Sequence, residues 1–182
     1  MPTLTKPKTE VTDLLADTAR RFHAPLVEAG VTVGLLAAWP NEGEDCAVKL
    51  HGYPCAAVVK VTPYRQRVQG IEDAVITVDG ELWQVMKEAE RVALLDHELQ
   101  HLEVALDRDG RLKRDDWGRP KLKVRLHDWE LGGFADVAVR HGAAAQEVRG
   151  FRDAHTRYHQ AIFSWSDDAA APDGFSPTAR VV

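Results

Sequence analysis

The sequence predicts an α+β fold with a small sheet and several helices. Three short apolar runs, rich in β-branched residues, predict strands at 31–38, 56–61 and 74–78. Over residues 82–107 apolar side chains recur at three- and four-residue steps, which predicts a long amphipathic helix. With 182 residues, 45% of them hydrophobic and 28% charged, the chain can bury the core of a single domain, expected over 11–163.

The other elements of the first half follow from local signals. Residues 1–10 are polar and are expected to form a flexible arm. A helix is expected to begin at Thr12 or Asp13, either of which could cap it, and to continue towards Gly30. Pro25 could end this helix early.

The second half begins with a charged stretch. Residues 107–119 mix positive and negative side chains, which is typical of a solvated connecting loop. Apolar and basic residues then alternate over 122–126, which predicts a short strand or extended arm. Two C-terminal helices are expected, at 128–142 and 143–163, followed by a disordered tail at 164–182.

Composition limits the cellular setting and the partners. A net charge of −5 and a pI near 5.9 make nucleic acid an improbable main partner. Cys46 and Cys55 are too few for a disulfide framework, and the N-terminus has no apolar segment typical of a signal peptide or membrane span. A cytoplasmic protein with no membrane partner is therefore expected.

The chemistry is indicated by an H-E-x-x-H motif inside the long predicted helix. His97 and His101 stand one helical turn apart, so both imidazoles can reach one metal ion. With Zn²⁺ bound there, Glu98 is placed to act as a general base on a metal-activated water. The motif predicts a zinc metallopeptidase that cuts a peptide or protein substrate.

A third metal ligand has to come from elsewhere, because the residues after His101 lack the third histidine of the metzincin pattern. His127 is the preferred ligand, since it lies where the extended arm meets the next helix and could aim its ring back at the first one. Glu130 is the alternative, and Asp128 is a helix cap or a partner that orients a ligand imidazole.

Two other functions remain open at this point. The protein could be a non-catalytic interaction protein whose metal only joins two helices, which closed coordination by both His127 and Glu130 would indicate. It could also be a metal hydrolase acting on a phosphate substrate, since many basic residues lie between 108 and 125. The acidic overall balance counts against this third possibility.

The chain also resembles the putative phage metallopeptidase family over roughly residues 10 to 145. The residues that carry the resemblance are Leu94-Leu95-Asp96-His97-Glu98-Leu99-Gln100-His101, Arg119-Pro120-Lys121-Leu122, His127-Asp128, Gly133-Phe134 and Arg140-His141-Gly142.

This resemblance implies a zincin-like fold, with the small mixed or antiparallel sheet beside the H-E-x-x-H helix. It implies that His97, Glu98 and His101 occupy the family's motif positions, and it adds a reason to prefer His127. In zincins an edge strand aligns the peptide, and residues 74–78, which lead into the helix, are the candidate for that edge, although a plain core strand is the favoured interpretation of this segment.

Overall fold

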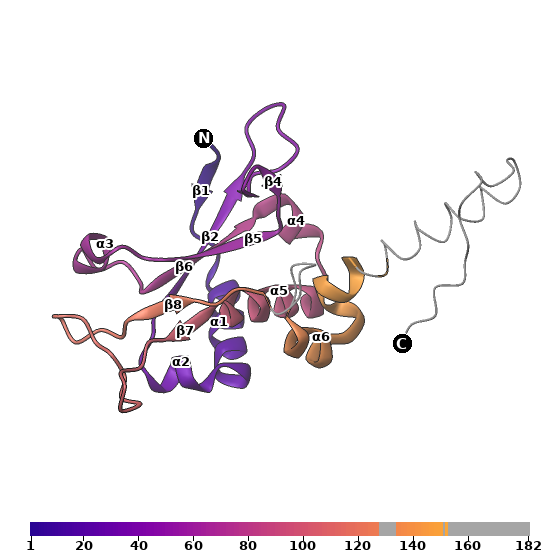
Figure 1. The fold of residues 1–182 in the computed structure, drawn as a ribbon. Helices are drawn as coiled ribbons and strands as arrows, with labels where there is room; N and C mark the ends of the chain where they lie inside the picture. Colours follow the sequence, from indigo (N-terminus) through magenta and orange to yellow (C-terminus); the bar gives the residue numbers. More distant parts are fainter. Residues whose placement is uncertain (128–133, 151, 153–182) are drawn as a thin grey trace, which may run out of the picture.

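The computed structural model describes residues 1–127, 134–150 and 152 (Figure 1). Its strands and helices, in chain order, are β1 (Thr3–Thr5), α1 (Thr9–Phe22), α2 (Ala24–Glu28), β2 (Val33–Trp39), β3 (Lys49–Leu50), β4 (Tyr53–Pro54), β5 (Ala57–Val61), α3 (Tyr64–Val68), β6 (Ala74–Asp79), α4 (Gly80–Val85), α5 (Glu88–Gln100), β7 (Leu102–Val104), β8 (Leu122–Val124), α6 (Ala135–His141) and the 3₁₀ turn η1 (Gly142–Ala144).

The main sheet is mixed and has the strand order β1-β2-β6-β5. β2 and β6 run parallel, with Leu35 opposite Ile76, whereas β1 pairs with β2, and β5 with β6, in the antiparallel sense. The three strands expected from the apolar runs are thus confirmed as β2, β5 and β6. β1 forms within the segment expected to be an arm, and Trp39 at its side donates its indole N–H to the Thr5 hydroxyl at 2.8 Å.

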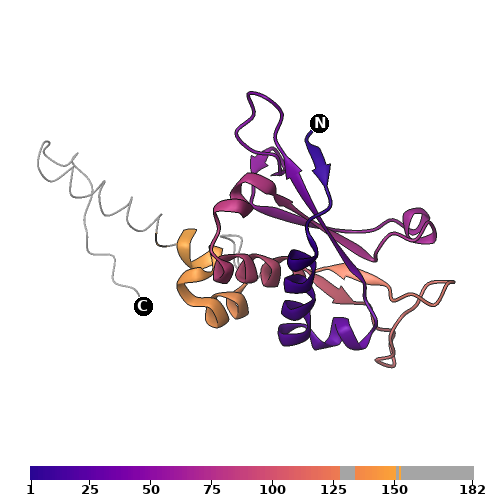
Figure 2. The same ribbon diagram turned by 180° about the vertical axis from the view of Figure 1, so that it is seen from behind.

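One face of this sheet carries the core. Alternate residues of β6 are buried, because every second side chain points towards the helices. In Figures 1 and 2, α1, α2, α5 and α6 all lie on the same side of the sheet. Core residues come from both layers: Leu15, Leu26, Leu35, Val59, Ile76, Val78, Leu94, Leu95 and Leu99. The fold is therefore the expected α+β arrangement, with a sheet beside the H-E-x-x-H helix.

The turn from β6 into α4 fixes where the helices begin. Asp79 caps α4 by accepting the N–H of Leu82 at 3.0 Å, and it also accepts the N–H of Ala47 at 2.8 Å. Gly80 follows directly, and a Cβ there would lie 2.8 Å from the Trp39 ring. Only glycine fits this close approach without moving the indole.

The long helix expected over 82–107 was wrong at both of its ends. The chain is extended at Met86, and α5 starts only after Lys87, whose N–H donates to the Glu90 carboxylate at 3.0 Å. α5 then ends at Gln100, and Leu102–Val104 form β7, which pairs with β8. Every residue of α5 from Ala93 to Leu99 is buried. The helix therefore has no face exposed to solvent over this stretch.

The N-terminal helix divides at the proline. α1 ends at Phe22, and Pro25 lies in the first turn of α2, where its missing N–H costs no hydrogen bond. After β8, the described chain resumes at Phe134 and forms α6. Asp128, Glu130 and the segment 164–182 lie outside the described residues, as does most of the expected helix at 143–163.

A buried ion network anchors the charged loop that follows β7. Arg67 donates to Asp73 at 2.5 Å and lies 3.3 Å from Asp115, and Arg119 reaches the same Asp73 oxygen at 2.9 Å. The Thr32 hydroxyl and N–H both donate to the other oxygen of Asp73. The loop is therefore attached to the body of the domain and is not merely a solvated connector.

Candidate metal centre

Three histidines from separate parts of the chain converge at the end of α5. His97 lies in the last turns of α5, His101 is its C-cap, and His127 follows β8. Each offers one ring nitrogen, and these three nitrogens all lie within 4.8 Å of one another. Nε2 of His97 and Nε2 of His127 are 3.2 Å apart. We call these three residues the histidine cluster; its geometry is that of a group able to hold one metal ion.

Two members of the cluster have a hydrogen-bond acceptor at Nδ1, the ring nitrogen opposite the Nε2 atom that could bind a metal. Nδ1 of His97 lies 2.7 Å from Oε1 of Glu147, and Nδ1 of His101 lies 2.8 Å from the carbonyl oxygen of Arg125. A carbonyl oxygen and a carboxylate can only accept, so Nδ1 carries the proton in both rings and Nε2 presents a lone pair. Arg125 also donates its N–H to the His101 carbonyl at 2.7 Å, which ties the strand that leads to His127 to the end of α5.

Phe134 packs against the whole histidine cluster. Its ring centroid is 5.2 Å from that of His97, 4.8 Å from that of His101 and 5.1 Å from that of His127. Phe134 is 0% exposed, so its ring is held in place by packing and supports all three imidazoles. The Arg125 guanidinium stacks over the same ring at 5.2 Å.

Glu98 is buried beside the cluster, with only 4% of the residue exposed. The backbone N–H of Val59 in β5 lies near its carboxylate and acts to lower its pKa. Burial raises the pKa of Glu98 to about 7, because the charged form is poorly solvated there. A carboxylate with this pKa can take up and release a proton near neutral pH.

Comparison with protein-family models gives a match over residues 7–156 to the family described as putative phage metallopeptidase. The chain belongs to this family. No curated protein and no solved structure matches the chain. The resemblance predicted from the sequence is thereby confirmed, and membership in a phage metallopeptidase family implies a hydrolase that uses a metal ion.

In this member of the family, the surroundings of the histidine cluster favour a neutral His101 imidazole and a charged Glu147 carboxylate. Burial lowers the pKa of His101 to about 4, so its ring is neutral at pH 7. Burial would raise the pKa of Glu147, but the hydrogen bond from His97 outweighs it and holds that pKa below the ordinary value. Neutral rings are the form that binds metal ions.

The structure brings together His97, His101 and His127, the three histidines that the sequence singled out as metal ligands. The alternative ligand, Glu130, lies outside the described residues. Glu147, which is 50 residues from its partner His97, was not predicted from the sequence. Phe134 was expected within the helix at 128–142 and carries part of the family resemblance, but no role at the site was predicted for it.

A second polar cluster is centred on the fully buried Asp96, which lies about 100° around α5 from His97. Its carboxylate lies 2.7 Å from Nε2 of His23 and 2.6 Å from Nε2 of His141, and Arg140 donates to both of its oxygens at 2.9 Å. These hydrogen bonds outweigh burial and keep the pKa of Asp96 far below its usual range. The cluster connects the end of α1, the middle of α5 and the end of α6.

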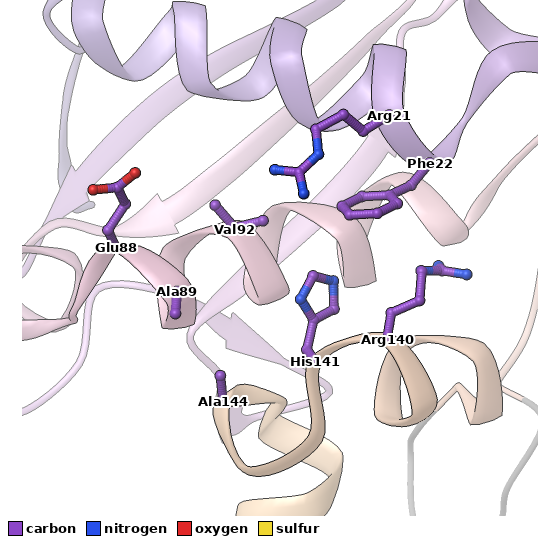
Figure 3. Close-up of a pocket in the computed structure, with 8 residues that line it drawn as sticks. All are labelled: Arg21, Phe22, Glu88, Ala89, Val92, Arg140, His141 and Ala144. Carbon is purple, nitrogen blue, oxygen red and sulfur yellow. The ribbon is translucent and has the colours of Figure 1, made fainter.

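Figure 3 shows a hollow lined in part by Arg140 and His141 of this cluster, with the His141 ring pointing from α6 towards Phe22. The α5 residues that line it are Glu88, Ala89 and Val92. No member of the histidine cluster lines it, and at about 100° per residue Glu88 and Val92 lie roughly 180° and 140° around α5 from His97. The hollow is therefore separate from the histidine cluster.

None of the helices in the described ranges is long and apolar enough to cross a membrane.

Proposed function

We propose that this protein is a zinc-dependent peptidase in which His97, His101 and His127 hold the metal and Glu98 is the general base. The observation that carries the proposal is the approach of three ring nitrogens within 4.8 Å of one another, next to a buried glutamate one residue along α5. Three histidines with one open position form a known arrangement in catalytic zinc sites.

The donor set fits zinc. Imidazole nitrogen is a suitable ligand for this borderline-soft ion, and the tautomers of His97 and His101 are already set with Nε2 available. His101 and His127 are only partly buried, so one side of the cluster is open to a substrate. Zinc bound there would supply a Lewis acid that polarises the scissile carbonyl and lowers the pKa of a water molecule to about 7.

Glu98 supplies the proton transfers. It would take a proton from the attacking water and return it to the amine that leaves, so no residue has to form a covalent bond to the substrate. The nearby N–H of Val59 favours the charged form of its carboxylate. Its burial also excludes bulk water, which would otherwise weaken every electrostatic interaction in the site.

The substrate is a peptide or protein, and we propose that it pairs with β5. The candidate edge, 74–78, is an internal core strand, as the favoured interpretation of that segment had it, because β6 lies between β2 and β5 in the sheet. β5 is the last strand in the order found for the described residues. The carbonyl of Ala56 and the N–H of Thr62 bond towards β6, so the backbone groups of Ala57, Val59 and Val61 face away from it. One of these groups, the N–H of Val59, lies near the Glu98 carboxylate.

The proposal is tested with the full-length protein by measuring bound zinc and cleavage of denatured casein. Glu98→Gln should keep zinc and reduce the turnover rate by about 10²- to 10⁴-fold, because it cannot accept a proton. His97→Ala should lose zinc and activity together. Glu103→Gln, an exposed neighbour on β7, is the matched control and should match the wild type.

A wild-type protein that binds no divalent metal would overturn the proposal. Equal cleavage by Glu98→Gln and wild type would remove Glu98 from the mechanism. If zinc binds and raises the melting temperature but casein, other denatured proteins and peptide libraries are never cut, the metal only joins structural elements.

A further inference from the structure

We propose that Glu147 is a positioning residue for the metal centre, acting through His97. It would hold the His97 ring in the tautomer and the direction that a metal ion requires, and so raise the affinity of the site. The role in metal binding rests on the proposed function above. The role in fixing the tautomer of His97 belongs to the protein with or without metal.

The hydrogen-bond geometry defines which atom carries the proton. Oε1 of Glu147 is 2.7 Å from Nδ1 of His97, and the backbone N–H of Phe134 points at the same oxygen from 3.4 Å. An oxygen that faces a second N–H donor is an acceptor, so the proton between Glu147 and His97 belongs to Nδ1. The opposite nitrogen, Nε2, then turns its lone pair towards Nε2 of His127, 3.2 Å away.

The burial of Glu147 argues against a role in packing alone. Its side chain is 1% exposed, and Oε2 has no hydrogen-bond partner among the residues that the structure describes. A buried carboxylate costs free energy unless it is paired, and an apolar side chain would fill the same space without that cost. The ion-pair partner found for this carboxylate in the described part of the chain is His97.

Glu147 is seated by other contacts that do not touch His97. It lies in the helical stretch 146–150, where Arg149 donates to Glu90 of α5 at 2.6 Å. Arg140 and His141, from α6 just before it, bind Asp96. The chain thus offers a matched control: Glu90→Gln weakens the attachment of the same stretch to α5 without removing the Glu147 carboxylate.

The first experiment measures the affinity of the full-length, chelator-treated protein for Co²⁺ by its absorption spectrum, with competition by Zn²⁺. Glu147→Ala should bind about 10- to 100-fold more weakly, the usual effect of losing a partner behind a metal ligand. Glu147→Gln should lose less, because the amide oxygen still accepts the Nδ1 proton. Glu90→Gln should stay within twofold of the wild type. Affinity unchanged in Glu147→Ala, or lowered equally in Glu90→Gln, would overturn the proposal.

The second experiment reads the His97 tautomer directly, by ¹⁵N NMR of the imidazole rings in the metal-free protein. The wild type and Glu147→Gln should show Nδ1–H, and Glu147→Ala should shift towards Nε2–H. This readout separates the two proposals: a wild type that binds no metal but shows the Glu147-dependent tautomer refutes only the peptidase. An unchanged tautomer in Glu147→Ala refutes the role of Glu147.

Discussion

At the scale of single residues, the centre depends on side chains that do not themselves offer a ligand atom. Phe134 touches all three rings of the histidine cluster, and Glu147 and the Arg125 carbonyl fix two of those rings from behind. A ring that is held by packing on one side and by a hydrogen bond on the other loses little freedom on binding a metal. The affinity of such a site is therefore distributed over its supporting residues.

Phe134→Ala should lower the free energy of unfolding by about 4 kcal/mol, because it leaves a cavity in a fully buried position. It should also weaken Co²⁺ binding, since the three imidazoles lose their common surface. Urea unfolding and Co²⁺ titration measure the two effects. Phe22→Ala is the control, because Phe22 packs on His141, at the Asp96 cluster. Metal affinity that is unchanged in Phe134→Ala would show that the rings do not need this support.

The sequence predicts part of this site for a clear reason. His97 and His101 are a local pattern, one turn apart on a helix, and His127 stands out because an extended arm ends there. Glu147 is one glutamate among many and meets His97 only because α6 turns the chain back over α5. No spacing rule connects residues that are brought together by tertiary folding.

At the scale of elements, the boundaries of α5 show where hydrophobic periodicity misleads. Leu102 and Leu106 extend the apolar stripe of the helix in sequence, so the pattern alone continues to residue 107. In the fold, Leu102 belongs to β7 and is buried there, whereas Leu106 is exposed. Strand pairing with β8 overrides the helical pattern, and it is this pairing that brings His127 back to His101.

The position of β5 gives a prediction for this scale. Ala57→Pro removes a backbone N–H that faces away from β6, so it should raise the KM for casein while the domain stays folded. Val58→Pro removes an N–H that faces β6, and it should destabilise the sheet. Steady-state kinetics and thermal unfolding of the two variants test this difference. An unchanged KM in a folded Ala57→Pro variant would exclude pairing of the substrate with this part of β5.

At the scale of the whole molecule, two buried carboxylates join distant parts of the chain. Asp96 connects α1, α5 and α6, and Asp73 connects the sheet to α3 and to the loop after β7. Both have hydrogen bonds that stabilise the charged form, so both should contribute to stability in a pH-dependent way. Asp96 directly precedes His97 in the sequence, so its substitution could also disturb the histidine cluster. Asp73 is not a sequence neighbour of any of the three histidines and is therefore the clearer test.

Asp73→Asn should lower the free energy of unfolding by about 3 kcal/mol at pH 7, because Arg67 and Arg119 lose their shared partner. Burial acts to raise the pKa of Asp73, but hydrogen bonds from Thr32 and Arg67 outweigh it and lower the pKa in the folded state. The stabilisation is therefore present above the unfolded pKa of about 3.9 and is lost as the pH falls through the lower folded value.

The difference in unfolding free energy between wild type and Asp73→Asn should thus stay constant from pH 7 to about 5 and become smaller below about pH 4. Urea unfolding across this range measures it. Asp17→Asn, which breaks an exposed pair with Arg20, is the control and should have little effect. A difference that grows as the pH falls would contradict the assignment.

The separation of 50 residues between His97 and Glu147 also affects how the protein is made. A ribosome releases α5 and its two histidines well before it has translated the carboxylate that aligns the first of them. We therefore expect that the metal centre of a nascent chain is incomplete until Glu147 has left the exit tunnel. Hydrolytic activity should then appear only late in synthesis. Such timing would spare neighbouring polypeptides during synthesis.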